Sequence, residues 1–206
     1  MAAQDYVMGL DFGTESVRVG IFTLEGQPLV FAAEPYPLSH PRAGWAEQDP
    51  ADWWAALVKA VHTALERSGL PKEAIVGIGA DCTSCTVVAV DAHFRPLRPA
   101  ILWNDSRALA EAAQLAAIPG VARLAGVLPM AGLTAPKALW LKRHEPEAFA
   151  RIACVLLPKD YLRLWLAGEH LSEMSDSAGT SWLDTGARKW SAELLAATDL
   201  DERQMP

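Results

Sequence analysis

Two short apolar runs near the N-terminus enclose a turn that carries an acid, a glycine and hydroxyl side chains. Residues 6–10 form the first run, residues 11–16 read Asp-Phe-Gly-Thr-Glu-Ser, and residues 17–22 alternate in polarity again. Two β-rich runs joined by a short glycine-containing turn predict a β-hairpin. This constrains the fold more than any other segment, because it requires the chain to begin with an antiparallel sheet.

The side chains of this turn suit a phosphate group. Gly13 lets the backbone approach a ligand closely, and the Thr14 and Ser16 hydroxyls can donate hydrogen bonds to phosphate oxygens. Asp11 can hold a hydrated Mg²⁺ ion. An ordinary hairpin turn explains the same residues equally well, because Asp and Gly favour turns for conformational reasons.

Composition excludes several classes of protein. The chain has 206 residues, of which 51% are hydrophobic, enough for one large or two small domains. Its net charge of −7 and the lack of a Lys/Arg cluster argue against nucleic acid or an anionic membrane as the main partner. No apolar run reaches about 20 residues, and no basic-then-apolar leader is present. We therefore expect a cytoplasmic protein.

The three cysteines, Cys82, Cys85 and Cys154, agree with a reducing compartment and do not suit a disulfide framework. The spacing of Cys82 and Cys85 matches a redox pair or half of a zinc site. A zinc site needs a second pair of ligands, which is missing, and the residues after Cys85 resemble a strand, whereas a redox pair begins a helix. Buried or pocket-lining thiols are the better interpretation.

Strands followed by alternating strands and helices are predicted for the rest of the chain. A third strand covers 29–33, and a helix with Asp49 as N-cap and Pro50 in its first turn ends at Gly69. The further strands expected are 74–80, 85–90 and 152–157, and Ile101–Trp103 leads into a helix that begins near residues 104–106. The remaining helices are 109–117, 135–143, 159–167 and, capped by Ser191 after an irregular stretch from Leu171, 192–197.

As a set, these residues resemble the FGGY carbohydrate kinases. Residues 9–14 with 16–18 look like the first phosphate loop of that family, and 44–50 with Trp53-Trp54 resemble the segment that opens its first helix. Residues 101–107, Ile-Leu-Trp-Asn-Asp-Ser-Arg, are similar to its sugar-contacting W-x-D-x-R stretch. Residues 157–163, 175–180, 190–191 and 204–206 look most like xylulokinases. The resemblance covers essentially the whole chain.

The resemblance implies an α/β protein with the ribonuclease H-like fold of the actin/Hsp70/hexokinase-type ATPases, a mixed β-sheet flanked by helices. It implies ATP and Mg²⁺ as cofactors and transfer of the γ-phosphate to a hydroxyl of a pentulose, with two lobes closing over both substrates. The cofactor-binding residues would be Asp11, which also meets the metal, Gly13, Thr14, Ser16 and Arg18. The sugar-binding residues would be Thr83, Ser84, Cys85, Trp103, Asn104, Asp105 and Arg107. Arg18 as a solvated strand charge and Asp105 as a plain helix-start charge are the alternatives.

Two departures from the family pattern leave questions open. Residues 81–88, Asp-Cys-Thr-Ser-Cys-Thr-Val-Val, look like ribulokinases, where xylulokinases typically have Gln-Met-His. Xylulose is therefore the first choice of sugar, with ribulose or another polyol as the alternative. The family's catalytic aspartate and adenine site come later than residue 206, so we expect no catalytic base in this chain.

Residues 1–206 would accordingly be most of an N-terminal sugar-kinase domain that lacks its C-terminal ATP-binding lobe and is inactive alone. A non-catalytic sugar-binding or regulatory module is an alternative of another class. An ATPase that acts on protein partners would leave residues 103–107 without a purpose. Family kinases often form homodimers, and the composition neither supports nor opposes this.

Overall fold

The computed structural model describes residues 4–206, which divide into two compact units. Unit 1 contains the residues up to 38 together with 51–83, and unit 2 contains 39–50 together with 84–206. Each unit has its own buried core.

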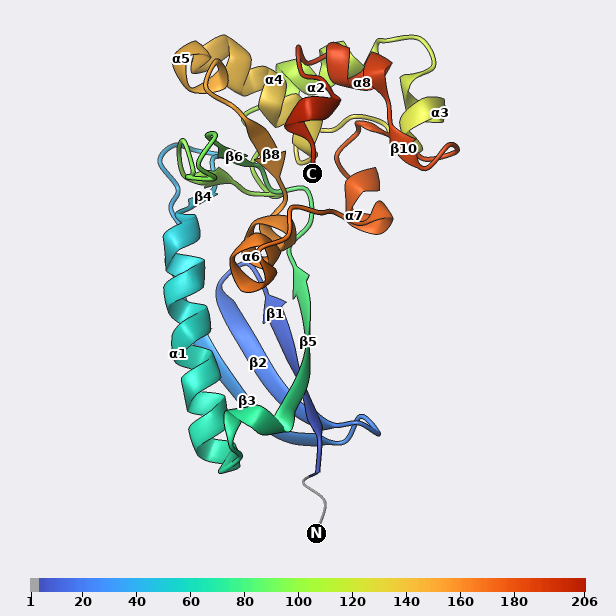
Figure 1. Ribbon diagram of the computed structural model, residues 1–206. Coiled ribbons are helices and arrows are strands. Elements are labelled where there is room, and N and C mark those ends of the chain that lie inside the picture. The colour runs from blue at the N-terminus through green and yellow to red at the C-terminus, as the bar shows by residue number, and fades with distance from the viewer. Residues whose placement is uncertain (1–3) are drawn as a thin grey trace. The chain divides into compact units, whose positions relative to one another are not determined.

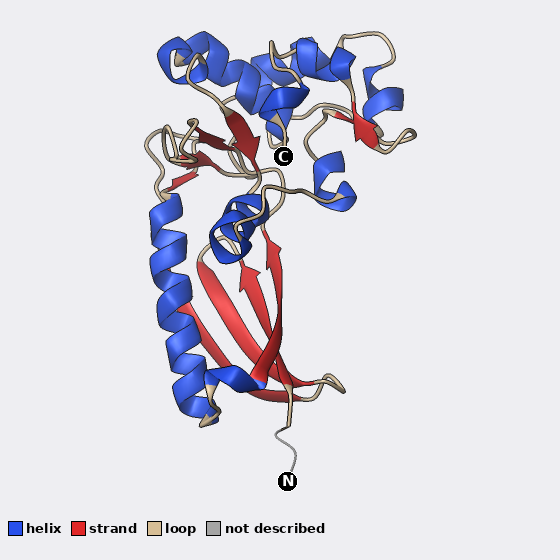
Figure 2. Cartoon of the chain, in the orientation of Figure 1, coloured by secondary structure: helices blue, strands red, loops and turns tan. Residues whose placement is uncertain are grey.

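Unit 1 is a four-stranded mixed sheet with one long helix (Figures 1 and 2). Its elements are β1 (Tyr6–Phe12), β2 (Ser16–Thr23), β3 (Pro28–Pro35), α1 (Pro50–Ser68), the 3₁₀ turn η1 (Lys72–Ala74) and β5 (Ile75–Cys82). The strand order is β3-β2-β1-β5. The first three strands pair antiparallel, and β5 joins β1 in parallel. The predicted opening meander and first helix are confirmed.

Alternation along the strands separates the two faces of this sheet. One face is apolar and buried, with Met8, Leu10 and Phe12 from β1 and Val17, Val19 and Ile21 from β2. Helix α1 runs along the sheet (Figure 1) and buries Trp53, Leu57, Ala60 and Ala64. Two of its polar side chains reach β3, since Lys59 Nζ lies 2.8 Å from Glu34 Oε2 and Arg67 donates to the Phe31 carbonyl at 3.1 Å.

Unit 2 is mainly helical, with three short antiparallel strand pairs, β4–β7, β6–β8 and β9–β10 (Figure 2). Its strands are β4 (Glu47–Gln48), β6 (Val88–Val90), β7 (Ala100–Ile101), β8 (Cys154–Leu156), β9 (Leu183–Asp184) and β10 (Lys189–Trp190). Its helices are α2 (Leu109–Ala116), α3 (Val121–Ala125), α4 (Thr134–His144), α5 (Pro146–Phe149), α6 (Pro158–Ala167), α7 (Met174–Ala178), α8 (Ala192–Ala196) and the 3₁₀ turn η2 (Glu202–Gln204). Trp182, Ile101 and Leu141 are among the fully buried members of its core.

Three local predictions for unit 2 were wrong. The strand expected over 85–90 is limited to β6, because Cys85 has a left-handed φ of 59° that interrupts extended backbone. The helix expected near residues 104–106 begins at Leu109 instead. The tail after Leu171 contains α7 and the β9–β10 hairpin, although Ser191 does cap α8 by accepting from the Leu194 amide at 3.3 Å.

No helix in the described part of the chain is long and apolar enough to cross a membrane. All three cysteines are free thiols, as expected, and Cys154 is buried.

Candidate phosphate and sugar sites

The hairpin turn between β1 and β2 is held by a buried tyrosine. The Gly13 amide donates to the Ser16 carbonyl at 3.0 Å, which closes the turn. The Tyr36 hydroxyl donates to the carbonyls of both Gly13 and Ser16, the latter at 3.1 Å. Burial raises the pKa of Tyr36, so its hydroxyl stays protonated and remains a donor. Sequence patterns did not predict this contact, because β2 and β3 separate Tyr36 from the turn along the chain.

Three charged side chains meet at the end of the sheet beside this turn. Asp11 is opposite Arg18 in the antiparallel register, and Asp11 Oδ2 lies 2.5 Å from Arg18 Nη2. Asp81 is next to Asp11 in the parallel register of β1 and β5. Because the Arg18 and Asp11 side chains are 62% and 46% exposed, the pair contributes at most about 1 kcal/mol and can open for a ligand.

An open hollow of about 520 Å³ begins at these charges and continues over the face of the sheet opposite α1. Its residues are Gly9, Leu10, Asp11, Arg18, Gly20, Phe22, Phe31, Gly79, Ala80 and Asp81. A Cβ atom at Gly20 would lie 2.6 Å from the Phe22 ring, whereas one at Gly79 would meet nothing within 4 Å. The Phe22 and Phe31 rings thus cover Gly20, whereas a ligand can approach the backbone at Gly79.

The donor atoms at this hollow fit Mg²⁺. Asp11 and Asp81 offer carboxylate oxygens, and Mg²⁺ prefers such hard oxygen ligands while keeping several waters. Within residues 4–206 no three His, Cys, Asp or Glu side chains form a metal-binding group. A magnesium ion here would therefore take its remaining ligands from water or phosphate.

The predicted sugar-contacting loop of residues 103–107 is organised around a buried ion pair in unit 2. Asp105 Oδ1 accepts from the Arg107 amide at 2.8 Å and from Arg107 Nε at 2.9 Å, and Asp105 Oδ2 accepts from Arg107 Nη2 at 2.7 Å. The same Oδ2 accepts from the Ala46 amide at 2.6 Å. Both side chains are 0% exposed. This local turn, made by Asp105 and Arg107, is also why no helix begins there.

Aromatic rings complete the surroundings of Arg107. Its guanidinium lies 3.7 Å from the centre of the Trp45 ring and 4.9 Å from that of Trp140. Its Nη1 lies 2.7 Å from Glu47 Oε1, in poor alignment for a hydrogen bond. Stacking and ion pairing together fix the guanidinium and, with it, the loop.

The loop presents different residues from those it buries. Trp103 is 48% exposed and Asn104 is exposed, whereas Asp105 and Arg107 have no accessible side chain. Gly132 packs closely beneath the loop, since a Cβ there would lie 2.5 Å from the Trp103 carbonyl oxygen. The geometry thus favours Trp103 and Asn104 for direct contact with a ligand, and Asp105 and Arg107 for holding the loop.

The other predicted sugar-binding segment, residues 83–85, spans the end of unit 1 and the start of a segment of unit 2. Thr83 donates its amide to the Phe12 carbonyl at 3.0 Å, so it continues the pairing of β5 with β1. Ser84 is exposed. Cys85 is half-buried, its Sγ donates to the Gly179 carbonyl at 3.4 Å, and burial raises the pKa of its thiol. Cys85 is therefore a neutral packing group at neutral pH.

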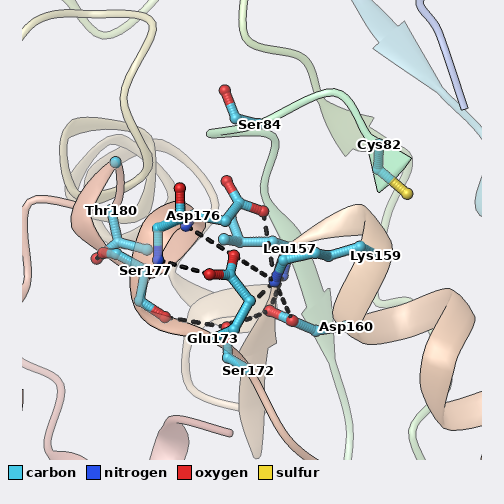
Figure 3. Close-up of polar contacts among 12 residues, drawn as sticks. Cys82, Ser84, Leu157, Lys159, Asp160, Ser172, Glu173, Asp176, Ser177 and Thr180 are labelled. Atoms are coloured by element: carbon cyan, nitrogen blue, oxygen red, sulfur yellow. Dashed lines mark hydrogen bonds and ion pairs between the residues drawn. The ribbon is translucent and has the colours of Figure 1, made fainter. Parts of the chain in front are cut away.

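A compact polar cluster joins the start of α6 to α7 (Figure 3). Lys159 Nζ lies 2.6 Å from Asp160 Oδ1, 3.5 Å from Asp176 Oδ2 and 3.6 Å from Glu173 Oε1. The Ser172 hydroxyl donates to Asp160 Oδ2 at 3.0 Å. Burial raises the pKa of Asp176 to about 6, although Lys159 opposes the shift. The cluster holds the two helix starts together, and the sequence patterns gave no indication of it.

Comparison with known proteins identifies the family. The profile described as "FGGY family of carbohydrate kinases, N-terminal domain" matches residues 6–206. Xylulose kinase from Escherichia coli (strain K12) is 44% identical over 200 residues, which are 97% of this chain and 41% of that protein. Xylulose kinase from Klebsiella pneumoniae is 42% identical over the same shares of the two chains.

Solved structures agree with this result. A "xyloylose kinase" from Brucella ovis has a TM-score of 0.95 and 49% identity, covering 98% of this chain and 42% of its own. A xylulose kinase from Rhodospirillum rubrum has a TM-score of 0.92 and 28% identity, with the same coverage. The chain thus spans about two fifths of the length of these relatives and has the actin/hexokinase-like ATPase fold. It belongs to the FGGY family of carbohydrate kinases and corresponds to the N-terminal domain of that family.

Proposed function

We propose that the protein containing this chain is an ATP-dependent pentulose kinase and that D-xylulose is its preferred sugar substrate. The observation that carries this proposal is the 44% identity to a xylulose kinase over 97% of the chain. The family profile matches residues 6–206, which span the hairpin that presents Asp11 and the loop that presents Trp103, so both kinds of site that phosphoryl transfer requires lie in the matched part of the chain.

The hairpin of unit 1 would bind the phosphates of ATP. Gly13, Thr14 and Ser16 lie in the turn that Tyr36 fixes, and Arg18 would exchange its ion pair with Asp11 for a phosphate oxygen. Asp11, with Asp81 beside it, would hold Mg²⁺ through water. When bound, the ion would neutralise phosphate charge. The contribution of the protein is to keep these groups at one end of the sheet before the ligand arrives.

The sugar would bind to the exposed residues of the two predicted segments. Trp103 offers a stacking face, Asn104 an amide and Ser84 a hydroxyl, all of which can reach solvent. Thr83 and Cys85 would shape the backbone on either side of Ser84. Asp105 and Arg107 would act indirectly, because their inaccessible side chains stabilise the loop from below.

We further infer that the general base comes from a part of the protein outside these residues. With the described chain alone, phosphate transfer would be slow or absent. A cytoplasmic location agrees with the three free thiols and the need for ATP. A homodimer stays a prediction, which light scattering of the purified protein would test.

The test is ADP release by the full-length protein with Mg²⁺ and ATP, measured across D-xylulose, D- and L-ribulose, the matching polyols, glycerol and no sugar. Sugar-stimulated turnover greatest with D-xylulose is the expected result. Turnover greatest with a ribulose would correct the substrate and keep the class. No stimulation by any sugar, together with a rise in melting temperature on adding one, would favour a non-catalytic sugar-binding module.

A further inference from the structure

Lys137 is a fully buried lysine in the middle of helix α4. Its relative exposure is 0%, and its neighbours in the helix, from Thr134 to Leu141, are all buried. A lysine in such a place is expected to pair with a carboxylate or to lose its proton. Lys137 instead donates to two backbone carbonyl oxygens, those of Gly132 at 2.6 Å and Cys85 at 3.0 Å.

The Cys85 carbonyl belongs to the Ser84–Cys85 segment, which we assign to the sugar site. Cys85 has the left-handed φ of 59°, a conformation that non-glycine residues rarely adopt and that its surroundings must enforce. Two side chains of α4 supply that restraint, because the Thr134 hydroxyl donates to the same Cys85 carbonyl at 3.3 Å. On the other side, the Cys85 thiol donates to the Gly179 carbonyl.

The Gly132 carbonyl belongs to the turn beneath the other sugar segment, residues 103–107. Gly132 approaches the Trp103 carbonyl so closely that a Cβ would have only 2.5 Å of space. Lys137 therefore makes one hydrogen bond toward each of the two segments, through residues that are 47 positions apart in the chain.

We propose that Lys137 is a positioning residue of the sugar site, which holds the Ser84–Cys85 segment and the turn beneath Trp103 at a fixed spacing. The proposal rests on the assignment of those two segments to sugar binding. It explains why a lysine occupies a buried helix position, since no apolar side chain can donate to both carbonyls. Lys137 itself has no accessible surface, so its role is to hold these segments and not to bind the sugar directly.

The charges around Lys137 make this arrangement sensitive to pH. Burial lowers the pKa of Lys137 to about 7, while Cys85 and Asp105 oppose the shift and Arg107 adds to it. Cys85 faces it from the segment after β5, and Asp105 and Arg107 face it from the loop after β7. A neutral amine can still donate to both carbonyls, but without charge assistance these hydrogen bonds weaken. Sugar binding should thus weaken as pH rises through 7.

The experiment compares Lys137→Met with Lys142→Met in the full-length protein. Lys142 lies on the same helix, is 40% exposed and pairs with Asp199, so its replacement controls for loss of a lysine from α4. With D-xylulose varied at saturating Mg²⁺ and ATP, Lys137→Met should raise the sugar KM about 10- to 100-fold. It should leave the ATP KM within about twofold, and Lys142→Met should change neither. The sugar KM of the unchanged protein should rise from pH 6 to 8, and that of Lys137→Met should not.

A second measurement does not depend on activity. Alkylation of Cys85 by iodoacetamide, followed by peptide mapping with buried Cys154 as the internal reference, reports whether the segment is held. Lys137→Met should accelerate labelling of Cys85 alone. If Lys137→Met fails to fold, Lys137→Gln, which keeps one donor group, should show intermediate values of both quantities. If the unchanged protein does not phosphorylate any sugar, the proposed function fails and the labelling still tests the hydrogen bonds.

Unchanged sugar KM and unchanged Cys85 labelling in the Met or Gln variant would overturn the proposal. An equal rise in the sugar and ATP KM values would also overturn it, because that pattern indicates a general packing defect.

Discussion

Replacing Arg107 with methionine should destabilise the protein strongly, and the matched change at Arg203 should not. Both arginines belong to an Asp-x-Arg sequence in which the arginine donates its amide and its side chain to the aspartate two residues earlier. Asp105 and Arg107 are 0% exposed, whereas the side chains of Asp201 and Arg203 are 49% and 89% exposed. The comparison therefore isolates burial from local geometry.

The magnitude follows from what Arg107→Met leaves behind. Three side-chain hydrogen bonds to Asp105 disappear, while the amides of Ala46 and residue 107 can still donate to it. Methionine retains much of the packing against Trp45 and Trp140, so the main cost is a buried carboxylate without its cation. Breaking a buried pair in this way costs about 3–5 kcal/mol.

The assay is urea unfolding followed by tryptophan fluorescence. Arg107→Met should lower the free energy of unfolding by about 3–5 kcal/mol, because it leaves the Asp105 carboxylate buried without its cation. Arg203→Met should match the unchanged protein. Equal losses of stability in the two variants would show that burial of the Asp105–Arg107 pair does not stabilise the loop.

Two further predictions concern the same unit. Asp176 has a folded pKa of about 6, above the ordinary 3.8, so between these values the native state binds more protons than the unfolded state. The free energy of unfolding should therefore fall by about 2 kcal/mol from pH 4 to 6. Asp176→Asn should remove that decline, as measured by urea titrations across this pH range. Gly132→Ala should lower the free energy of unfolding by about 1–3 kcal/mol and raise the sugar KM, because the new Cβ would lie only 2.5 Å from the Trp103 carbonyl oxygen. In the control Gly79→Ala, where a Cβ meets nothing within 4 Å, both the stability and the sugar KM should stay close to those of the unchanged protein.

Local sequence patterns predicted the structure correctly where residues close together in the chain determine it. The β1–β2 hairpin and α1 were predicted because their period, caps and turn residues are adjacent in the chain, and the structure confirms both elements. Residues that act through distant contacts were missed. Asp81 lies beside Asp11 only through the parallel register of β5 with β1. Tyr36, the residue after β3, reaches the turn because the C-terminal end of β3 pairs with the start of β2. The position of Lys137 is visible in the sequence as a single charged residue among the otherwise uncharged residues 134–141 of helix α4.

The two Asp-x-Arg sequences show why a sequence predicts the residues of a site better than their tasks. From residue types alone, Asp105 and Arg107 are suitable partners for sugar hydroxyls, and the same is true of Asp201 and Arg203. Burial decides whether such a charged side chain contacts the ligand or supports the loop. For Arg107, burial is set by Trp45 and Trp140, which lie far from the loop in sequence. Once those rings cover Arg107, the charged residues can only hold the loop, and the uncharged Trp103 and Asn104 are left to meet a ligand. A loop whose charges are inside is rigid before the ligand binds, and for a polyol, whose hydroxyls need defined partners, that rigidity favours selective recognition.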